Sequence, residues 1–306
     1  MNPALLIMGP TASGKSALAL AVAEQIGGEI VNADSMQVYR DFRVLTARPT
    51  PEEEKHVTHH LYGHVDAAER YSTGRWLSDA LTAIAHVRER GKTPILVGGT
   101  GLYFKALTRG LAAMPEVDDE LRAALQARAA NEGAVVLHAE LARRDPLTAA
   151  RLDPNDAPRI IRALEVMEAT GESIASFQAN TKPTLTIDEW RGLALTPNRE
   201  MLYAAIDARF ESMLAAGALD EVRTFVARSL DPTLPAAKAH GAPSLSAHLR
   251  GEATLAQARE TAQRDTRRYA KRQFTWIANQ MPNWPRLAAP GLPERVKAAL
   301  ELLGKA

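Results

Sequence analysis

A glycine-rich loop near the amino terminus has the residue types that bind phosphate. Its positions are Gly9, Pro10, Thr11, Ala12, Ser13, Gly14, Lys15 and Ser16, which fit the P-loop pattern. The two glycines allow backbone angles that side chains forbid, so successive N–H groups can converge on phosphate oxygens at the positive end of the next helix. Lys15 adds a positive charge, and the Ser16 hydroxyl is a ligand for Mg²⁺. The pattern predicts a phosphate site, although it does not say whether the phosphate belongs to a nucleotide.

The loop has the flanking elements that a P-loop requires. Apolar residues 4–8 predict a buried strand before it, and residues 17–26 predict a helix after it. Residues 29–33 predict a second buried strand that ends next to Asp34. Ligands of open α/β sheets bind outside the carboxyl ends of the strands, so this aspartate is a candidate site residue. The simpler alternative is that Asp34 only caps a helix.

A third predicted strand covers residues 94–97 and ends in the glycine-rich turn 98–103. This turn falls at the same edge, where the backbone passes close to a ligand. The middle of the chain then shows helix signals without strands between them, at residues 121–129, 134–143 and 156–169. We expect an α/β fold with two parts. Residues 1–114 and 184–306 would form a P-loop core with a parallel sheet and helices on both faces, and residues 115–183 would form a small inserted helical domain.

Composition excludes several classes of protein. The 306 residues are 46% hydrophobic and 24% charged, which is typical of a globular chain of about two domains. Cysteine is absent, so disulfides and thiolate zinc sites are excluded. The first apolar run is short and no basic segment precedes it, which argues against a signal peptide or a membrane span. We expect a cytoplasmic protein without membrane contact.

A basic segment near the carboxyl end, residues 264–276, also carries Tyr269, Phe274 and Trp276. Five basic residues fall within nine positions of this segment. Those that share one face of a helix are Arg264, Arg268, Lys271 and Arg272. Cations interleaved with aromatic rings suit a nucleic acid, which offers phosphates and unstacked bases. The alternative is an ordinary solvated helix face.

Seven short segments are spread along nearly the whole chain, at residues 9–16, 34–39, 46–49, 59–61, 98–103, 159–166 and 271–276. In their residues and their order, these segments resemble the tRNA dimethylallyltransferases, also called tRNA isopentenyltransferases. The resemblance implies a transferase that moves the dimethylallyl group of dimethylallyl diphosphate to N6 of the adenine just 3′ of a tRNA anticodon. In that family the P-loop holds the diphosphate of the prenyl donor.

The resemblance also implies roles for particular residues. Lys15 and Arg209 would stabilise the departing diphosphate together with Mg²⁺, for which Ser16 is the protein ligand. Asp34 would accept the N6 proton, with Thr100 beside it. The residues that match tRNA contacts of the family are Asp34, Ser35, Met36, Gln37, Thr100, Arg122, Pro158, Arg159, Ile160, Ile161, Arg162, Lys238, His240, Gly241, Lys271, Arg272, Gln273, Phe274, Thr275 and Trp276. The partners would be dimethylallyl diphosphate and the anticodon stem-loop of tRNA, and we expect a monomer.

Two segments depart from the family. Residues 241–243 are Gly-Ala-Pro where the family has a Gly-Tyr pair and a polar residue, and Ala278 stands where an arginine is common. Both fall in segments that contact tRNA, so they bear on tRNA affinity and not on the diphosphate chemistry.

Three alternatives share part of the pattern. A P-loop nucleotide kinase often has an aspartate for Mg²⁺ at the end of a strand, whereas the strand 94–97 ends in glycines. An adenylate isopentenyltransferase, which acts on the free nucleotide, shares the P-loop chemistry but needs neither the insertion nor the basic segment. A non-enzymatic RNA-binding module leaves the P-loop and Asp34 unexplained.

Overall fold

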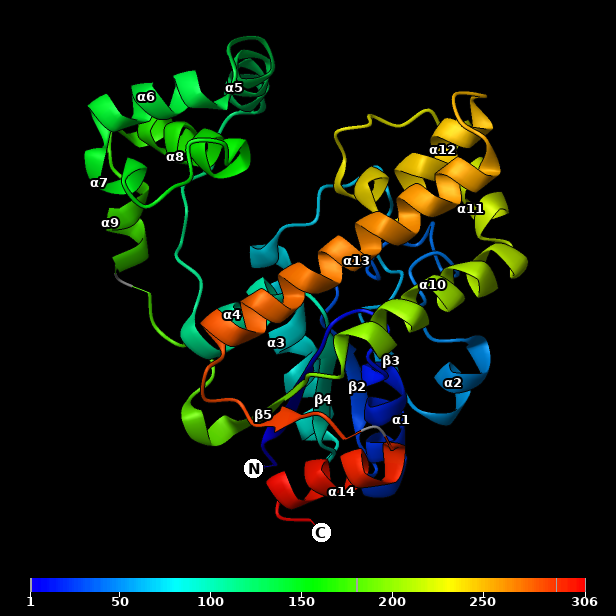
Figure 1. Cartoon of the computed structure of the whole chain (residues 1–306). Helices are drawn as coiled ribbons and strands as arrows, with labels where there is room; N and C mark the ends of the chain where they lie inside the picture. The colour runs from blue at the N-terminus through cyan, green and yellow to red at the C-terminus, as the bar shows by residue number, and fades with distance from the viewer. Residues whose placement is uncertain (1, 180, 290, 306) are drawn as a thin grey trace. The chain divides into compact units, whose positions relative to one another are not determined.

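The computed structural model describes residues 2–179, 181–289 and 291–305. The chain divides into two compact units (Figure 1). The first combines Met1–Thr108 with Leu185–Ala306, and the second is Arg109–Thr184. The predicted insertion, 115–183, falls inside the second unit, which begins before and ends just after it.

The first unit contains a six-stranded sheet in which every strand pairs in parallel, as the sequence predicted. Its order is β3-β2-β4-β1-β5-β6. The strands are β1 (Ala4–Met8), β2 (Glu29–Asn32), β3 (His59–His60), β4 (Pro94–Gly98), β5 (Trp190–Leu195) and β6 (Arg286–Leu287). Because β1 lies between β4 and β5, the loop that follows it leaves the middle of the carboxyl edge.

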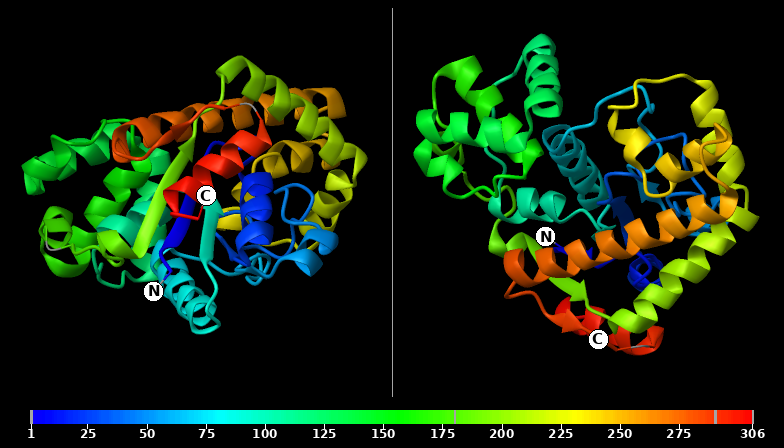
Figure 2. Two further views of the ribbon diagram at one scale, coloured as in Figure 1. Left: turned by 90° about the horizontal axis from the view of Figure 1, so that it is seen from below. Right: turned by 45° about the horizontal axis from the view of Figure 1, so that its top comes forward.

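Helices cover both faces of this sheet, which confirms the predicted fold class (Figure 2). Alternate residues of β1 face opposite sides, as strand geometry requires. Leu5 and Ile7 pack with α1 (Lys15–Ile26) and α14 (Leu292–Leu302). Leu6 and Met8 belong to the core that includes α3 (Thr73–Glu89) and α4 (Gly101–Arg109).

The first unit contains further helices among its described residues. The longer ones are α10 (Arg199–Ala215), α11 (Ala218–Ala227), α12 (Ala242–Leu249) and α13 (Leu255–Gln280). The short ones are α2 (Pro51–His56), η1 (Ile187–Glu189) and η2 (Pro235–Lys238). Asn198 caps α10, because its side chain accepts hydrogen bonds from the backbone N–H groups of Glu200 and Met201. None of the described helices is both long and apolar enough to cross a membrane.

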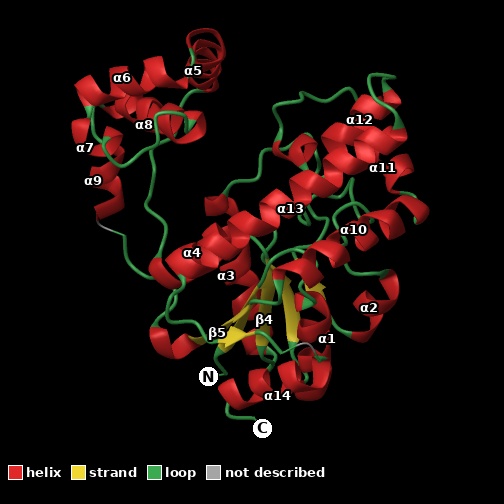
Figure 3. Cartoon of the chain, in the orientation of Figure 1, coloured by secondary structure: helices red, strands yellow, loops and turns green. Residues whose placement is uncertain are grey.

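The described residues of the second unit form helices joined by loops, with no strand among them (Figure 3). Its helices are α5 (Asp119–Glu132), α6 (Ala134–Arg144), α7 (Pro146–Ala149), α8 (Ala157–Thr170) and α9 (Ile174–Ala179). The three helices that the sequence predicted correspond to α5, α6 and α8. Leu125, Leu137, Leu141, Ile160 and Leu164 are buried together, so this unit has its own hydrophobic core.

Candidate active site

The P-loop joins the central strand to a helix whose first turn is uncapped. Gly14 is the N-cap of α1 with φ of 83°, and no side chain caps the helix. The first turn of α1 also contains no acidic residue. Ala12 has φ of 62°, which is uncommon for a residue other than glycine. The loop therefore points free N–H groups and the positive end of a helix at one place, which is the geometry of an anion site.

Two cations stand at this loop. The Lys15 ammonium donates to the Pro10 carbonyl at 3.3 Å, and the Arg209 guanidinium donates to the Thr11 hydroxyl. Burial lowers the pKa of Lys15 to about 8. The charge of Asp34 opposes this shift, and the charge of Arg209 adds to it. Burial also lowers the pKa of Arg209. Both groups lose solvation on burial, and the attraction of Asp34 does not offset this loss. A bound anion would therefore stabilise their charged forms.

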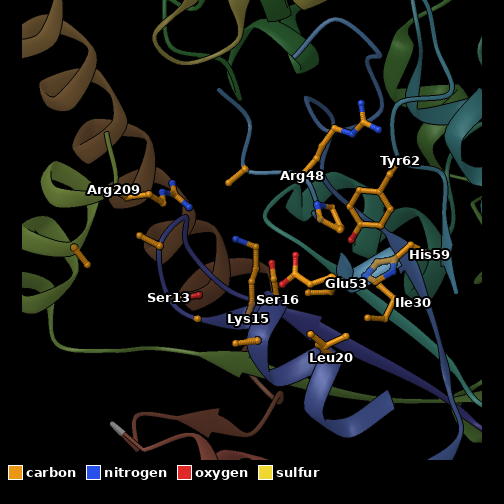
Figure 4. Close-up of a pocket in the computed structure, with 17 residues that line it drawn as sticks. Ser13, Lys15, Ser16, Leu20, Ile30, Arg48, Glu53, His59, Tyr62 and Arg209 are labelled. Carbon is orange, nitrogen blue, oxygen red and sulfur yellow. The ribbon is translucent and has the colours of Figure 1, made fainter. Parts of the chain in front are cut away.

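A cavity of about 450 Å³ opens in front of the loop (Figure 4). Its lining includes Lys15, Ser16, Glu53, His59, Tyr62 and Arg209. In Figure 4 the Glu53 carboxylate reaches from the opposite wall toward Ser16. One carboxylate oxygen of Glu53 accepts the Thr50 N–H at 2.7 Å in a capping box, which fixes the side chain. Sequence reasoning did not identify Glu53 as a site residue.

A second, smaller cavity of about 60 Å³ lies on the other side of Arg209. Its polar lining includes Thr11, Asp34, Thr46, Arg209, His240 and Tyr269. The rings of His240 and Tyr269 are 4.3 Å apart, centroid to centroid. Arg209 lines both cavities, so a group transferred from one to the other would pass beside its guanidinium.

Asp34 is held at the end of β2 by its neighbours. Its Oδ1 accepts the Met36 N–H at 2.9 Å, so the predicted alternative of a capping role is partly correct, for a turn and not a helix. Thr100 accepts the Ser35 N–H at 2.9 Å and donates to the Ser35 hydroxyl at 3.2 Å. The structure thus joins Asp34 to Thr100 through Ser35. The second carboxylate oxygen of Asp34 has no hydrogen-bond partner among the residues that the structure describes.

The basic face of α13 is exposed as predicted, at Arg264, Arg268, Lys271 and Arg272. Arg264 and Arg268 each lie 3.5 Å from Asp265, whereas Lys271 and Arg272 have no acidic partner among the residues that the structure describes. A hollow of about 350 Å³ beside this face is lined by predicted tRNA contacts, among them Lys238, His240, Gly241 and Arg272. Unpaired exposed cations next to a hollow suit a polyanion.

Three predicted tRNA contacts are buried in the structure, and one of them, Gly241, still borders the hollow beside α13. Ile160 has no exposed surface and belongs to the core of the second unit. Gln273 is 4% exposed, and its amide bonds to Thr11 and Gly99 inside the first unit. We correct the assignments of Ile160 and Gln273, because neither side chain can reach an RNA in this conformation. Phe274 and Trp276 are also half-buried against the core, so Thr275 is the exposed residue of these three.

The other predicted contacts of the second unit sit on α5 and α8. Arg122 and Arg162 flank the buried Glu165, at 3.6 and 3.0 Å. Pro158 and Arg159 are exposed, and Ile161 is half-buried. These residues form a surface of that unit alone.

Sequence reasoning missed Arg295 on α14. Its guanidinium is 9% exposed and donates to the Ser13 carbonyl at 2.8 Å and to the Ala289 carbonyl at 2.6 Å. It therefore holds the P-loop from behind. No sequence signal marks it, because one arginine in an amphipathic helix normally faces solvent.

The fold and these cavities define a P-loop α/β protein with an anion pocket, an adjoining carboxylate and a basic helix. The family model described as IPP transferase matches residues 37–280. The chain therefore belongs to the IPP transferase family.

Individual relatives agree over nearly the full length. A tRNA dimethylallyltransferase of Nitrobacter hamburgensis is 57% identical over 282 residues, 92% of this chain and 89% of the relative. That of Maricaulis maris is 52% identical over 303 residues, 99% of this chain and 98% of the relative.

Solved structures show the same similarity. The full-length tRNA isopentenylpyrophosphate transferase of Bacillus halodurans has a TM-score of 0.71 at 32% identity, with 100% of this chain and 97% of that chain covered. A eukaryotic dimethylallyltransferase acting on tRNA has a TM-score of 0.79 at 28% identity, with 96% of this chain and 75% of that chain covered.

Proposed function

We propose that this chain transfers the dimethylallyl group from dimethylallyl diphosphate to N6 of the adenine 3′-adjacent to a tRNA anticodon. One observation carries the proposal beyond family membership: Arg209 lines both the P-loop cavity and the cavity of Asp34. An electrophile bound as a diphosphate and a nucleophile beside a carboxylate would meet at this guanidinium.

The first cavity suits the prenyl donor. As the bond between the allylic carbon and the diphosphate oxygen breaks, negative charge grows on the leaving group. Lys15, Arg209 and the free N–H groups at the start of α1 are already oriented to stabilise that charge. A partly dry cavity strengthens these interactions relative to water.

The same cavity fits Mg²⁺. Oxygen ligands are what this ion prefers, and proteins usually hold it by one or two side chains together with phosphate oxygens. The Ser16 hydroxyl and the facing Glu53 carboxylate supply such a pair. When bound, the ion would offset part of the diphosphate charge.

The second cavity suits the acceptor. The adenine amine is a weak nucleophile, so its proton must be accepted as N6 bonds to the allylic carbon. Asp34 has one carboxylate oxygen available for this proton, while the diphosphate keeps the electron pair of the broken bond. His240 and Tyr269 offer aromatic surface to an adenine turned out of its loop.

The exposed cations of α13 support a tRNA acceptor over a free nucleotide. AMP carries one phosphate, which would leave Arg268, Lys271 and Arg272 without a role, whereas an anticodon stem-loop offers a run of phosphates. A tRNA substrate supports a cytoplasmic location.

The test is incubation of the protein and Mg²⁺ with labelled dimethylallyl diphosphate and either tRNA or AMP. We expect label on an adenine of the tRNA next to the anticodon and none on AMP. Label on AMP alone would establish an adenylate transferase. Transfer of a phosphoryl group from ATP to an added nucleotide, which leaves ADP, would establish a kinase.

A further inference from the structure

Gln273 lies on the same turn of α13 as two of the exposed cations, but it faces the opposite way. Residues two apart on a helix point to nearly opposite sides. Lys271 is accordingly exposed, while Gln273 is 4% exposed. One turn of this helix therefore presents a cation outward and an amide inward.

The inward amide joins two parts of the candidate active site. Its Oε1 accepts the Thr11 N–H at 2.9 Å, and its Nε2 donates to the Gly99 carbonyl at 2.9 Å. Thr11 belongs to the P-loop, and Gly99 directly follows β4, the strand next to β1. A side chain at position 99 would collide with the Gln273 amide, so this junction requires glycine there.

The neighbouring contacts of the loop also come from helices. The Thr11 hydroxyl accepts from Arg209 on α10. Ala12 packs in a small apolar cluster with Ile206 of α10 and with Phe274 of α13. The first half of the P-loop therefore takes its position from α10 and α13, and a shift of α13 would move the loop.

We infer that Gln273 is a positioning residue through which tRNA bound to the outer face of α13 strengthens binding of the diphosphate at the P-loop. This inference rests on the proposed function. A ligand that binds the cations of α13 favours the helix position in which the Gln273 side chain forms both of its hydrogen bonds, to Thr11 and to Gly99. A ligand bound to the P-loop favours the same position, so each raises the affinity for the other by the same factor.

The test compares Gln273→Met, which keeps the length of the side chain and loses both hydrogen bonds, with a matched control. Gln263 is also on α13 and donates to the Asp207 carbonyl at 3.2 Å and to Glu211 at 3.0 Å, both on α10. Gln263→Met thus removes a comparable pair of bonds away from the loop. The probe is inorganic diphosphate with Mg²⁺, titrated by calorimetry with and without saturating tRNA.

We expect tRNA to tighten diphosphate binding by about 5-fold or more in the wild type and in Gln263→Met, and to leave it unchanged in Gln273→Met. Binding of tRNA alone should be equal in all three proteins. Should Gln273→Met fail to fold, Gln273→Asn serves instead, since it keeps an uncharged amide but is one methylene too short to bond to both Thr11 and Gly99; a reduced enhancement is then expected.

Equal diphosphate affinity with and without tRNA in the wild type would overturn the inference, as would full enhancement in Gln273→Met. Neither result would affect the proposed function, which fails only if the wild type transfers no label to tRNA. Because the readout is equilibrium binding, a simple loss of catalytic rate cannot imitate the expected result.

Discussion

Asn32 holds the backbone of Asp34 from both sides. Its Oδ1 accepts the Asp34 N–H at 2.8 Å, and its Nδ2 donates to the Asp34 carbonyl at 3.0 Å. The same Nδ2 donates to the Leu61 carbonyl at 3.0 Å, and Asn32 itself is fully buried. The main chain at Asp34 is therefore fixed, and its carboxylate is the part that can act on a substrate.

Asp34→Asn should slow prenyl transfer by about 10²–10⁴-fold, because the variant keeps the shape of the side chain and loses the base. Affinity for the prenyl donor should change little, since the donor binds at the P-loop. Single-turnover measurements at saturating substrates would report the chemical step. A wild-type rate in that assay would reduce Asp34 to a turn cap.

Lys15→Ala and Arg209→Ala should each weaken diphosphate binding and slow transfer, because each removes a charge matched to the leaving group. The affinity for tRNA should stay nearly unchanged. Steady-state kinetics with the donor varied, together with tRNA filter binding, would separate the two effects. Unaltered transfer kinetics in both variants would contradict the assignment of the donor site.

Diphosphate binding should weaken as pH rises through about 8. Burial lowers the pKa of Lys15 to about 8 in the free protein, so the ammonium is charged below this pH and neutral above it. A bound anion raises that pKa, and binding above pH 8 therefore takes up a proton. Calorimetry in buffers of different ionisation enthalpy would measure the uptake, which should vanish in Lys15→Ala.

Replacing Arg268, Lys271 or Arg272 by alanine should weaken tRNA binding and reduce the salt slope by about 0.7 to 0.9 for each phosphate that is no longer neutralised. Arg223 on α11 is a matched control, because it is exposed and paired with Asp220 three residues away. Binding would be measured over a range of salt concentrations. If all three slopes equal that of Arg223→Ala, the basic face of α13 is only a solvated surface.

The folded state should lose stability in acid, because protonation of Glu29 removes a stabilising charge. Burial disfavours its ionisation, but hydrogen bonds from Arg90, His60 and Lys92 outweigh burial and hold the pKa of Glu29 at about 2. Since this pKa is depressed, the stabilisation is complete above the ordinary value of 4.5 and is lost as pH falls toward 2.

The contribution at neutral pH is roughly 1 to 3 kcal/mol, because solvent screens the half-exposed Arg90 and Lys92. Glu29→Gln should therefore unfold at lower denaturant concentration than the wild type at pH 7, and the difference should shrink toward pH 3. A difference independent of pH would show that the carboxylate charge is not what matters.

Strands β1, β2 and β4 and the P-loop were predictable from sequence because their signals are local, whereas the two-residue strands β3 and β6 were not predicted. Residues 4–8 form an apolar run, and the glycine spacing of the loop has a direct steric cause. Asp34 was predictable from topology, since parallel strands meet at one carboxyl edge. The helices of the insertion were predictable from periodicity, although the small core that buries Ile160 was not.

The contacts that hold the loop were not predictable in this way. Gln273 and Arg295 lie far along the chain from Thr11 and Ser13, and both belong to helices whose polar residues otherwise face solvent. Nothing in the local sequence tells an inward glutamine from an outward one. Asn32 offered the best unused signal, because an asparagine inside a buried strand needs hydrogen-bond partners.

The bond between Arg295 and the Ser13 carbonyl has a consequence for protein synthesis. The P-loop precedes its supports at Arg209, Gln273 and Arg295 in the sequence, so it is translated before them. β5, one of the two strands that flank β1, also follows the whole second unit. A nascent chain thus exposes the glycine-rich loop without a complete pocket, and it gains the capacity to bind a diphosphate only once α14 has been translated.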